Sequence, residues 1–341
     1  DKYNIRRILF FLSFLIFLIL IYLGYLDYSG VVQPYHVYIC SILLGILLGI
    51  DFPARNAYFP KIIPEKYLRS GISLNGATMA GSSVVVPTIG GFLIAEYGSF
   101  IGILLSAIGY LVMSISTFFI PSVSIPKDNS SNLSFFTEGF SYVVKNELFY
   151  CLILLTYCTN FFIFGYIQAL PAFIDVFNGT PRELGLMFSC AGLGALSGLL
   201  TAGKVNINKN LGAIILSSAS FFSVLIILVS LVGVGIMPTY VPFTNILLIF
   251  PLATIGHFGN GFYMLSTYAV IQSKVPENIR GRVMGIVAIH ISIGVLGGLW
   301  VGGIGEIFNM RVGVGSGPII CIILIIYLYI FKKSIRNLQK I

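Results

Sequence analysis

Pro276-Glu277 is followed 26 residues later by Gly302-Gly303, and this arrangement repeats an earlier one in the 341-residue chain. Pro64-Glu65 precedes Gly90-Gly91 by the same 26 residues, and the two copies begin 212 residues apart. In each copy the Pro-Glu pair lies in a short loop with three basic residues, namely Lys61, Lys66 and Arg69, then Lys274, Arg280 and Arg282. A Gly-rich apolar segment comes after each loop. A parallel repeat of this length predicts a membrane protein built from two similar halves, an organisation typical of transporters.

The composition places the chain in the membrane. Hydrophobic residues make up 57% of the sequence and charged residues 9%, whereas soluble proteins have about 25% charged residues. The mean hydropathy is +0.96. Apolar runs of about the 20 residues that a bilayer requires predict an all-α bundle of ten spanning helices. We place them near 7–26, 36–58, 71–96, 100–120, 148–174, 183–202, 211–235, 243–272, 283–305 and 315–331.

The positive charge is distributed by loop. The formal net charge is +8, and all of the 20 Lys and Arg residues except Arg55, Arg182 and Arg311 lie at the chain ends or in alternate loops. The intervening loops near 27–35, 97–99 and 236–242 carry none. This bias predicts that both ends are cytoplasmic. Because the basic residues are divided among separate loops, we expect no nucleic-acid partner.

Motifs of catalysis and metal binding are missing from the sequence. All five cysteines fall inside apolar segments and none forms a CxxC pair, so no disulfide framework or metal site is expected. No HExxH, GxSxG or Walker motif occurs, and the repeat has no filter-like loop. We therefore expect neither an enzyme nor a channel, and no cofactor.

The two halves are unequal in length. In the second half two predicted helices precede the basic loop of Lys204 and Lys209, whereas in the first half the matching basic segment is the N-terminus itself. We therefore expect the halves to be 1–120, holding helices 3–6 of a twelve-helix fold, and 148–341, holding helices 7–12. The first two helices would then be missing. Polar residues 121–147 are expected to be a cytoplasmic linker with a short amphipathic helix near 134–146.

Four stretches in this order resemble the major facilitator superfamily, and specifically its twelve-helix drug:proton antiporter branch of enterobactin exporters and macrolide efflux proteins. They are Asp1 to Ile8, Asp51 to Arg55 with Pro60 and Pro64-Glu65, Pro87 to Gly91, and Gln272 to Met284. The resemblance implies two pseudo-symmetric six-helix halves. Val86 stands where the helix-5 motif of the family usually has Gly, so the resemblance implies export more firmly than antiport. The loop 203–212 keeps basic residues but lacks the Asp of the signature.

Ionisable residues inside spans are the proton-coupling candidates, because a charge at the bilayer centre costs about 3 kcal/mol on insertion scales. Asp51 and Arg55 are four residues apart on one helix face, and His257 and His290 titrate near neutral pH when unperturbed. The alternatives are a purely structural ion pair between Asp51 and Arg55 and, for each histidine, a satisfied buried ring.

The resemblance also implies which residues line a central substrate cavity, and the loop charges themselves supply the candidates for a cytoplasmic gate. The cavity candidates are Tyr38, Tyr157, Asn160, Gln168, Asn260 and Tyr263, and the gate candidates are Asp1, Arg6, Arg7, Glu65, Arg69, Arg280 and Arg282. A weak ionic latch in the gate is one interpretation of these loop charges. Simple topology anchors are the other.

Small residues spaced four apart predict close helix contacts, since helices in a bilayer associate through small side chains. These ladders are Gly294, Gly298 and Gly302; Gly194, Gly198 and Ala202; and Ser83, Pro87 and Gly91. Static packing and faces that slide during transport are both compatible with them.

The function expected from these features is secondary active, proton-coupled export of a small amphipathic compound, a drug or a siderophore, by alternating access. We expect a monomer in a bacterial plasma membrane, with the lipid bilayer, protons and the substrate as its partners. Import of another small solute and a non-transporting receptor or assembly factor on the same scaffold are the alternatives.

Overall fold

The computed structural model describes residues 5–121, 133–204, 210–232 and 246–338, and leaves some side chains undescribed within 53–84, within 133–137 and at 278. These residues form helices and no strand. Helices satisfy their backbone hydrogen bonds internally, which is what a bilayer without water demands. The all-α class predicted from the composition is confirmed.

Nine segments of the described chain are long and apolar enough to cross a membrane. They are Ile5–Tyr28, Pro34–Phe52, Ser99–Phe119, Glu147–Ile167, Pro181–Lys204, Leu211–Leu231, Ile246–Lys274, Ile279–Ile307 and Met310–Phe331. The tenth predicted span, 71–96, falls on a helix whose apolar described stretch is the shorter Val85–Tyr97. The chain is an integral membrane protein.

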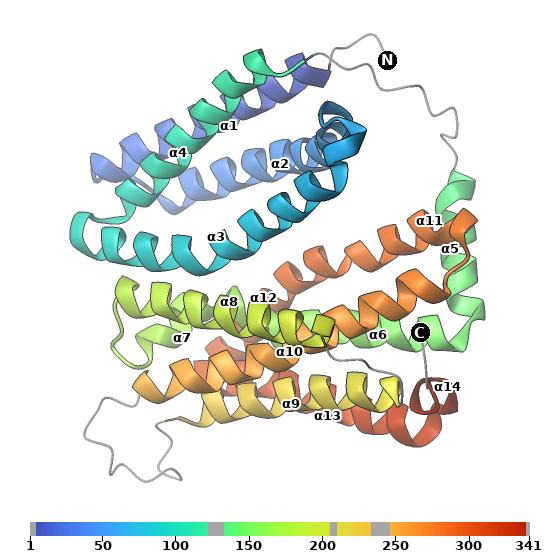
Figure 1. Ribbon diagram of the computed structural model, residues 1–341. Helices are drawn as coiled ribbons and strands as arrows, with labels where there is room; N and C mark the ends of the chain where they lie inside the picture. The colour runs from blue at the N-terminus through green and yellow to red at the C-terminus, as the bar shows by residue number, and fades with distance from the viewer. Residues whose placement is uncertain (1–4, 122–132, 205–209, 233–245, 339–341) are drawn as a thin grey trace. The chain divides into compact units, whose positions relative to one another are not determined.

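The chain divides into two compact units, one of Asp1–Ser82 with Ile89–Asn129 and one of Ser83–Thr88 with Ser130–Ile341. Helices of the first unit pack around α1, which contacts α4 and α2 (Figure 1). The elements of this part of the chain are α1 Ile5–Tyr28, α2 Pro34–Ile62, the short turn Glu65–Tyr67, α3 Leu68–Tyr97, α4 Ser99–Ser116 and the turn Thr117–Phe119.

Local sequence explains where these helices begin and end. Pro34 occupies the first turn of α2, where its missing N–H costs no hydrogen bond. Gly98 separates α3 from α4 with φ of 89°, a backbone conformation that residues with a Cβ rarely adopt. At the same junction Ser99 donates a hydrogen bond of 2.5 Å to the carboxylate of Asp27, which ties the end of α1 to the start of α4.

The second unit contains more helices, several of them interrupted. Its elements are α5 Leu133–Lys145, α6 Glu147–Cys158, a π-helical turn Thr159–Ile163, a 3₁₀ turn Phe164–Ile167, α7 Leu170–Asp175, α8 Pro181–Lys204, α9 Leu211–Leu231, α10 Ile246–Lys274, α11 Glu277–Ala288, α12 His290–Ile307, α13 Met310–Phe331 and α14 Lys333–Arg336. α6 and α13 each begin at an Asn side chain, Asn146 and Asn309, that accepts a backbone N–H of the first turn.

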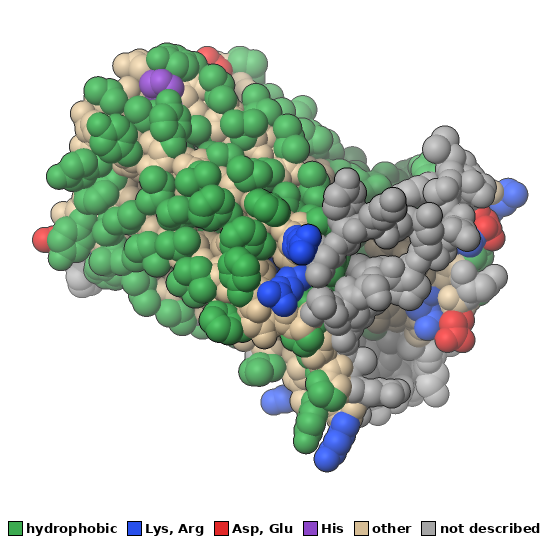
Figure 2. Space-filling model, turned by 90° about the horizontal axis from the view of Figure 1, so that it is seen from above, with side chains coloured by type: hydrophobic (Ala, Val, Ile, Leu, Met, Phe, Trp, Pro, Cys, Tyr) green, Lys and Arg blue, Asp and Glu red, His purple; other side chains and the backbone are tan. Residues whose placement is uncertain are grey.

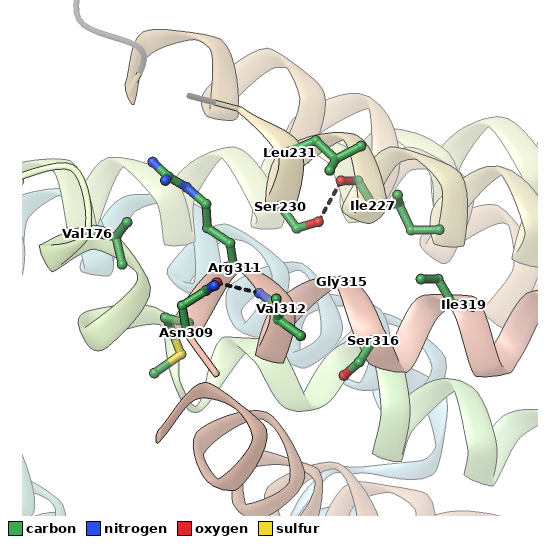
Figure 3. Close-up of a pocket in the computed structure, with 11 residues that line it drawn as sticks. Val176, Ile227, Ser230, Leu231, Asn309, Arg311, Val312, Gly315, Ser316 and Ile319 are labelled. Atoms are coloured by element: carbon green, nitrogen blue, oxygen red, sulfur yellow. Dashed lines mark hydrogen bonds between the residues drawn. The ribbon is translucent and has the colours of Figure 1, made fainter. Parts of the chain in front are cut away.

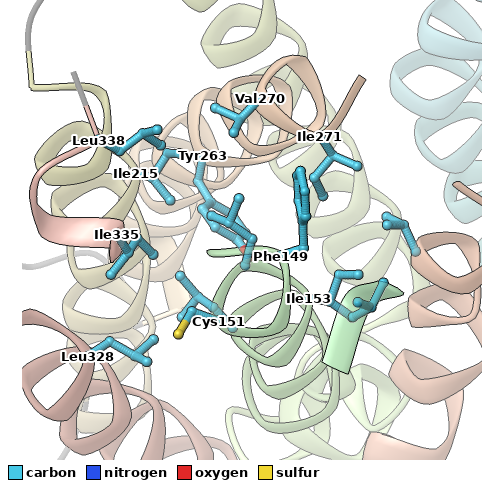
Figure 4. Close-up of a cluster of buried hydrophobic side chains, with 14 of the residues drawn as sticks. Phe149, Cys151, Ile153, Ile215, Tyr263, Val270, Ile271, Leu328, Ile335 and Leu338 are labelled. Atoms are coloured by element: carbon cyan, nitrogen blue, oxygen red, sulfur yellow. The ribbon is translucent and has the colours of Figure 1, made fainter. Parts of the chain in front are cut away.

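Two clusters of buried hydrophobic side chains form the core of the second unit. One cluster gathers residues of α6, α9, α10, α13 and α14, with Phe149 and Tyr263 among its largest members (Figure 4). The other gathers residues of α7, α8, α9 and α10 around Tyr166 and Phe173. Burial of this kind stabilises the helices' mutual positions, whereas exposed apolar side chains face lipid.

The predicted amphipathic helix of the linker is present as α5. It lies against α11, where the Cα of Gly139 sits so close that a Cβ there would be 2.9 Å from the Cβ of Arg282. The guanidinium of Arg282 forms an ion pair with the exposed carboxylate of Glu138. This helix is therefore part of the second unit, where its Val143 is also buried in one of the hydrophobic clusters.

The surface agrees with a lipid environment. Figure 2 shows one face on which hydrophobic side chains predominate and charged side chains are few. Phe11, Leu15 and Leu18 on α1 are examples of large apolar residues that are exposed. Contiguous apolar surface of this extent is rare in soluble monomers.

Candidate functional site

The charged pair of the first unit is held in a three-residue hydrogen-bonded set. On α2 the Arg55 guanidinium donates two hydrogen bonds to the Asp51 carboxylate, from Nε to Oδ2 at 2.7 Å and from Nη2 to Oδ1 at 2.9 Å. The same Nη2 donates to the hydroxyl of Ser13 on α1 at 2.7 Å. Ser13 in turn donates to the carbonyl of Leu9 at 2.9 Å. The set therefore joins α1 to α2.

Burial makes this pair electrostatically important. The side chain of Asp51 is 6% exposed and that of Arg55 26% exposed. A two-pronged Arg-carboxylate bond is among the stronger pairings available to side chains, and removing one partner of a buried pair costs several kcal/mol. Tyr110 on α4 lies close enough for both charges to act on its phenol. This is the titratable constellation that the spacing of Asp51 and Arg55 predicted.

The second constellation surrounds the point where the helix begun by α6 changes its winding. Thr156 is its centre, since its hydroxyl accepts from Tyr263 on α10 at 3.1 Å and its carbonyl accepts from the Asn160 amide at 2.8 Å. Thr159 donates to the same Tyr263 oxygen at 3.4 Å. These side chains are buried. Asn160 thus bonds the carbonyl four residues before it through its side chain, a local contact between a side chain and the backbone at the start of the π turn.

Glycines allow other helices to approach this irregular turn. Gly297 of α12 and Gly165 face each other so closely that a Cβ on either would overlap backbone atoms of the segment opposite. Gly317 of α13 lies in the same way against the carbonyl of Phe162. Gly294 lies beside Asn160. A Cβ added to Gly294 would be 3.6 Å from the carbonyl oxygen of Asn160. The π turn is therefore clamped between α12 and α13 by backbone contacts.

His257 on α10 is fully buried within the second unit. Its Nδ1 donates to the carbonyl of Ala253 at 2.9 Å, and its Nε2 lies 3.5 Å from the hydroxyl of Tyr166. The ring also packs edge-on against Phe222 and Phe164. The contacts found for this ring within the described chain are all with neutral groups.

His290 and Tyr157 lie where α11 meets α12. His290 Nδ1 donates to the carbonyl of Val287 at 2.7 Å and lies 3.4 Å from the hydroxyl of Tyr268. Tyr157 donates to the carbonyl of Ile286 at 2.5 Å. Both side chains satisfy backbone carbonyls at the end of α11, so each has a structural role in addition to its predicted functional one.

The remaining cavity candidates, Tyr38, Gln168 and Asn260, come from three different segments of the chain. Tyr38 on α2 is exposed, and so is Gln168, which comes after the 3₁₀ turn and lies against Gly298 of α12. Asn260 on α10 is half-buried, one turn from His257. The assignment of these residues to a substrate cavity stays a prediction.

The gate candidates are described in part. Asp1 lies outside the described residues, and the side chains of Glu65 and Arg69 are not described. Arg6 donates to the carbonyl of Ile120 at 3.3 Å and lies over the ring of Phe118, while Arg7 is exposed. Arg280 approaches the carbonyl of Val275, and Arg282 holds the linker helix. Arg6 and Arg282 thus each bind within their own unit.

The structure describes the surroundings of residues in two of the predicted small-residue ladders. Gly194 and Gly198 of α8 touch the backbone of α10 at Thr254 and Phe258, whereas the space beside Gly302 of α12 is open. Ser83 lies outside the described side chains. On α12 the residue in closest backbone contact is Gly297, which is not a member of the predicted ladder.

Sequence reasoning missed three hydroxyl residues that complete the two constellations: Ser13, Thr156 and Thr159. A signal for Ser13 was available, because it is the only Ser or Thr within the apolar run 7–26. A polar side chain inside a span needs a partner, so its presence predicts a bond to another helix.

In the part of the chain that the structure describes, nine apolar spans with buried charged and hydroxyl groups inside them define a polytopic membrane protein of the transporter type. The sequence profile of the Major Facilitator Superfamily matches residues 1–298. The chain belongs to that superfamily.

Named relatives are similar over most of the chain. The enterobactin exporter EntS of Shigella boydii serotype 18 is 24% identical over 278 residues, which cover 80% of this chain and 63% of the relative. EntS of Escherichia coli strain K12 is 22% identical over 309 residues, covering 89% of this chain and 71% of the relative. This chain thus spans less than two thirds of the length of the Shigella protein.

Two solved structures share the fold. A bacterial homologue of the iron transporter ferroportin, in an inward-facing state, superposes with a TM-score of 0.68 and 14% identity over 96% of this chain and 83% of its own. A bacterial homologue of the human lysosomal transporter Spinster gives a TM-score of 0.58, with 14% identity over 96% of this chain and 82% of its own. At this identity the likeness concerns the fold alone.

Proposed function

We propose that the protein is a secondary active transporter that exports a small amphipathic compound, a siderophore or a drug, across a bacterial inner membrane by alternating access. Membership of the Major Facilitator Superfamily supports transport. The similarity to proteins named enterobactin exporters supports export and a siderophore-like substrate. The protein acts as a monomer, with both ends of this chain in the cytoplasm.

The observation that carries proton coupling is the buried set of Asp51, Arg55 and Ser13. Asp51 is a carboxylate on a spanning helix, and its charge is balanced by Arg55 through two hydrogen bonds. A proton on Asp51 removes the negative charge and weakens these two hydrogen bonds, so Arg55 is left with Ser13 as its partner. Because Ser13 belongs to α1, protonation changes the bonding between α1 and α2.

Asp51 is a better coupling residue than His257 on these contacts. A proton on His257 would place a charge among the rings of Phe222, Phe164 and Tyr166, where the described neighbours include no carboxylate to balance it. Burying an uncompensated charge is costly. His290 is less enclosed, but its Nδ1 is already committed to the carbonyl of Val287.

Transport in vesicles tests the proposal. The full-length protein is reconstituted, and efflux of a fluorescent drug panel and of a catecholate siderophore is measured with and without an imposed proton gradient. We expect gradient-dependent export in the wild type. Asp51→Asn is expected to lose the dependence on the gradient, while Asp27→Asn, which makes the same chemical change at the α1–α4 junction, retains it.

The outcomes separate the parts of the proposal. Movement of a compound in the direction opposite to the expected export would show that the protein is an importer. No movement of any compound by folded, inserted protein would contradict the transport function. Gradient-dependent export that survives in Asp51→Asn but is lost in His257→Ala or His290→Ala would move the coupling site to a histidine.

A further inference from the structure

A pocket of about 690 Å³ lies in the second unit where α9 ends and α13 begins (Figure 3). Its walls come from the residue after α7, Val176, from the last two turns of α9 and from the first three turns of α13. It is outside both constellations described above. Its lining is mostly apolar, with Arg311 and Asn309 at one end and the hydroxyls of Ser230 and Ser316 along the walls.

Arg311 has donors that the protein does not use. Its Nε is buried and has no hydrogen-bond partner in the described chain, and its guanidinium rests on the ring of Phe177 at 5.1 Å. A guanidinium has five N–H donors in a planar fork that matches phosphate and carboxylate oxygens. Stacking on Phe177 holds that fork in place without occupying it. Arg311 therefore offers an anchored site for an anion.

The start of α13 adds to the attraction for an anion. Asn309 caps the helix by accepting the N–H of Val312 at 3.0 Å. The first turn of a helix also presents N–H groups without intrahelical partners and the positive end of the helix dipole. Arg311 lies in that first turn. The charge of Arg311 and the dipole of α13 both favour a negatively charged ligand.

The rest of the pocket suits a hydrocarbon chain. Ile227 and Leu231 of α9 and Ile319 of α13 line it, and Ile319 is 51% exposed. Arg311 and Ile319 are eight residues apart on one helix, which corresponds to about 12 Å along the axis. A ligand with an anionic head at Arg311 thus meets an apolar wall that runs into the membrane-spanning part of the bundle.

We propose that this pocket binds the phosphate headgroup and the upper acyl chain of an anionic membrane phospholipid, in the leaflet opposite the one that holds α14. A phospholipid fits because one molecule supplies both the anion and the chain, and because the apolar lining residues Val312 and Ile319 are exposed. Inorganic phosphate would use the polar end alone.

Trp300 provides the measurement. It is the single tryptophan of the 341 residues, and its Nε1 donates to the hydroxyl of Ser316, a lining residue of the pocket, at 3.1 Å. Bromine atoms on a bound acyl chain quench nearby tryptophan emission. Dibromo-acyl phosphatidylglycerol and dibromo-acyl phosphatidylcholine are titrated separately into the full-length protein in detergent, and a Trp300→Phe variant supplies the background.

We expect phosphatidylglycerol to quench Trp300 at a concentration about tenfold lower than phosphatidylcholine, because both lipids carry a phosphate but the choline cation of phosphatidylcholine offsets the charge that attracts Arg311. Arg311→Gln should abolish that preference, and Arg311→Lys, which keeps the charge, should retain part of it. Arg182→Gln, at the start of α8 and outside the pocket lining, should leave the preference intact. Size-exclusion elution and circular dichroism confirm that each variant is folded.

Three results would overturn the lipid assignment. Equal quenching by the two lipids would show that the headgroup charge is not recognised. A preference that persists in folded Arg311→Gln would place recognition elsewhere. If inorganic phosphate at the concentration of the lipid restored the Trp300 emission that the bound lipid had quenched, the pocket would be a site for a free anion.

Discussion

At the scale of single residues, the first unit depends on a charge that is almost hidden from solvent. Asp51 is tolerated there because Arg55 neutralises it and Ser13 accepts a further guanidinium N–H. Desolvation of two charges offsets much of their mutual attraction, so a pair of this kind adds little net stability. Its disruption is nevertheless costly, because the survivor is left buried without a partner.

Asp51→Asn is therefore expected to lower the stability of the folded protein by about 2–3 kcal/mol, near the lower end for a broken buried pair because Arg55 is partly exposed. The double variant Asp51→Asn with Arg55→Gln should be less destabilised than Asp51→Asn alone. Melting temperatures measured by circular dichroism in detergent compare both. Additive losses in the double variant would show that the two side chains are not coupled.

Two glycines of α12 provide a matched test of close helix packing. A methyl group on Gly297 would overlap the carbonyl of Phe161, whereas one on Gly302 meets nothing within 4 Å. We expect Gly297→Ala to cost about 1–3 kcal/mol, as overpacking does in well-packed interiors. Gly302→Ala should be close to neutral. Equal melting temperatures for the two variants would contradict the proposed clamp on the π turn.

Residue-level prediction succeeded where partners are near in sequence. Asp51 and Arg55 share a face of one helix, so their spacing alone predicts the pair. Ser13 is 42 residues from Arg55, and its role depends on how α1 packs against α2. The contact of Gly297 with Phe161 likewise depends on the winding of another helix, which the spacing of small residues in α12 does not contain.

At the scale of elements, α14 shows how a short helix is fixed by contacts outside itself. Lys332, just before it, donates to Glu147 at the start of α6 with an N···O distance of 2.9 Å. Ile335 is buried, and its carbonyl lies directly against Gly212 of α9. Four residues are too few for a stable isolated helix, so these tertiary contacts determine its position.

The Lys332 contact predicts a dependence on alkaline pH. The hydrogen bond to Glu147 and, to a smaller extent, the attraction of its charge raise the pKa of Lys332. A raised pKa means that the stabilisation is complete below the ordinary lysine pKa of about 10.4 and is lost as pH rises through the folded-state value. Lys332→Gln should melt at a lower temperature than Lys333→Gln at pH 8, with the difference closing above the lysine range.

Melting curves of the two variants between pH 8 and pH 12 check this, since all other titrations are common to both. Lys333 is a suitable control because it is exposed and adjacent. A difference that stays constant over the whole range would indicate that the ammonium charge of Lys332 is not what holds α14.

The spans themselves were predictable, and their interruptions were not. Apolar length located nine of the ten expected segments directly, because a bilayer selects for that length. The predicted helix 148–174 is in fact α6, a π turn, a 3₁₀ turn and α7, and the predicted 283–305 is divided between α11 and α12 at Ile289. Such breaks arise from contacts with neighbouring helices, which hydropathy does not record.

At the scale of the whole molecule, the charges of the loops predict its orientation. Both ends of the chain and every second loop are basic, so they should face the cytoplasm. Ser29 lies in the exposed turn between α1 and α2, a loop without Lys or Arg, and Lys333 lies in the basic segment after α13. The two positions should therefore be on opposite sides of the membrane.

Labelling of intact cells with a membrane-impermeant maleimide measures this. Ser29→Cys should react from outside, and Lys333→Cys should react only after the cells are opened. The parent protein supplies the background from its own cysteines, of which Cys40, Cys151 and Cys321 are buried. The reverse pattern would show that the bias is inverted in this protein.

The π turn at Thr159–Ile163 also sets the rotational phase of the residues that come after it in the span. An α-helix advances 100° per residue, and a π turn accommodates one additional residue per turn. The π turn alone holds the side chains after it back by about a quarter of a revolution, and the 3₁₀ turn Phe164–Ile167, which has about 3.0 residues per turn, recovers most of that offset before Gln168. Removing one residue from this turn would rotate Gln168 away from Gly298 while leaving the hydropathy of the span unchanged. In alignments across this superfamily, a single-residue gap here is therefore a change of helical face rather than a change of length.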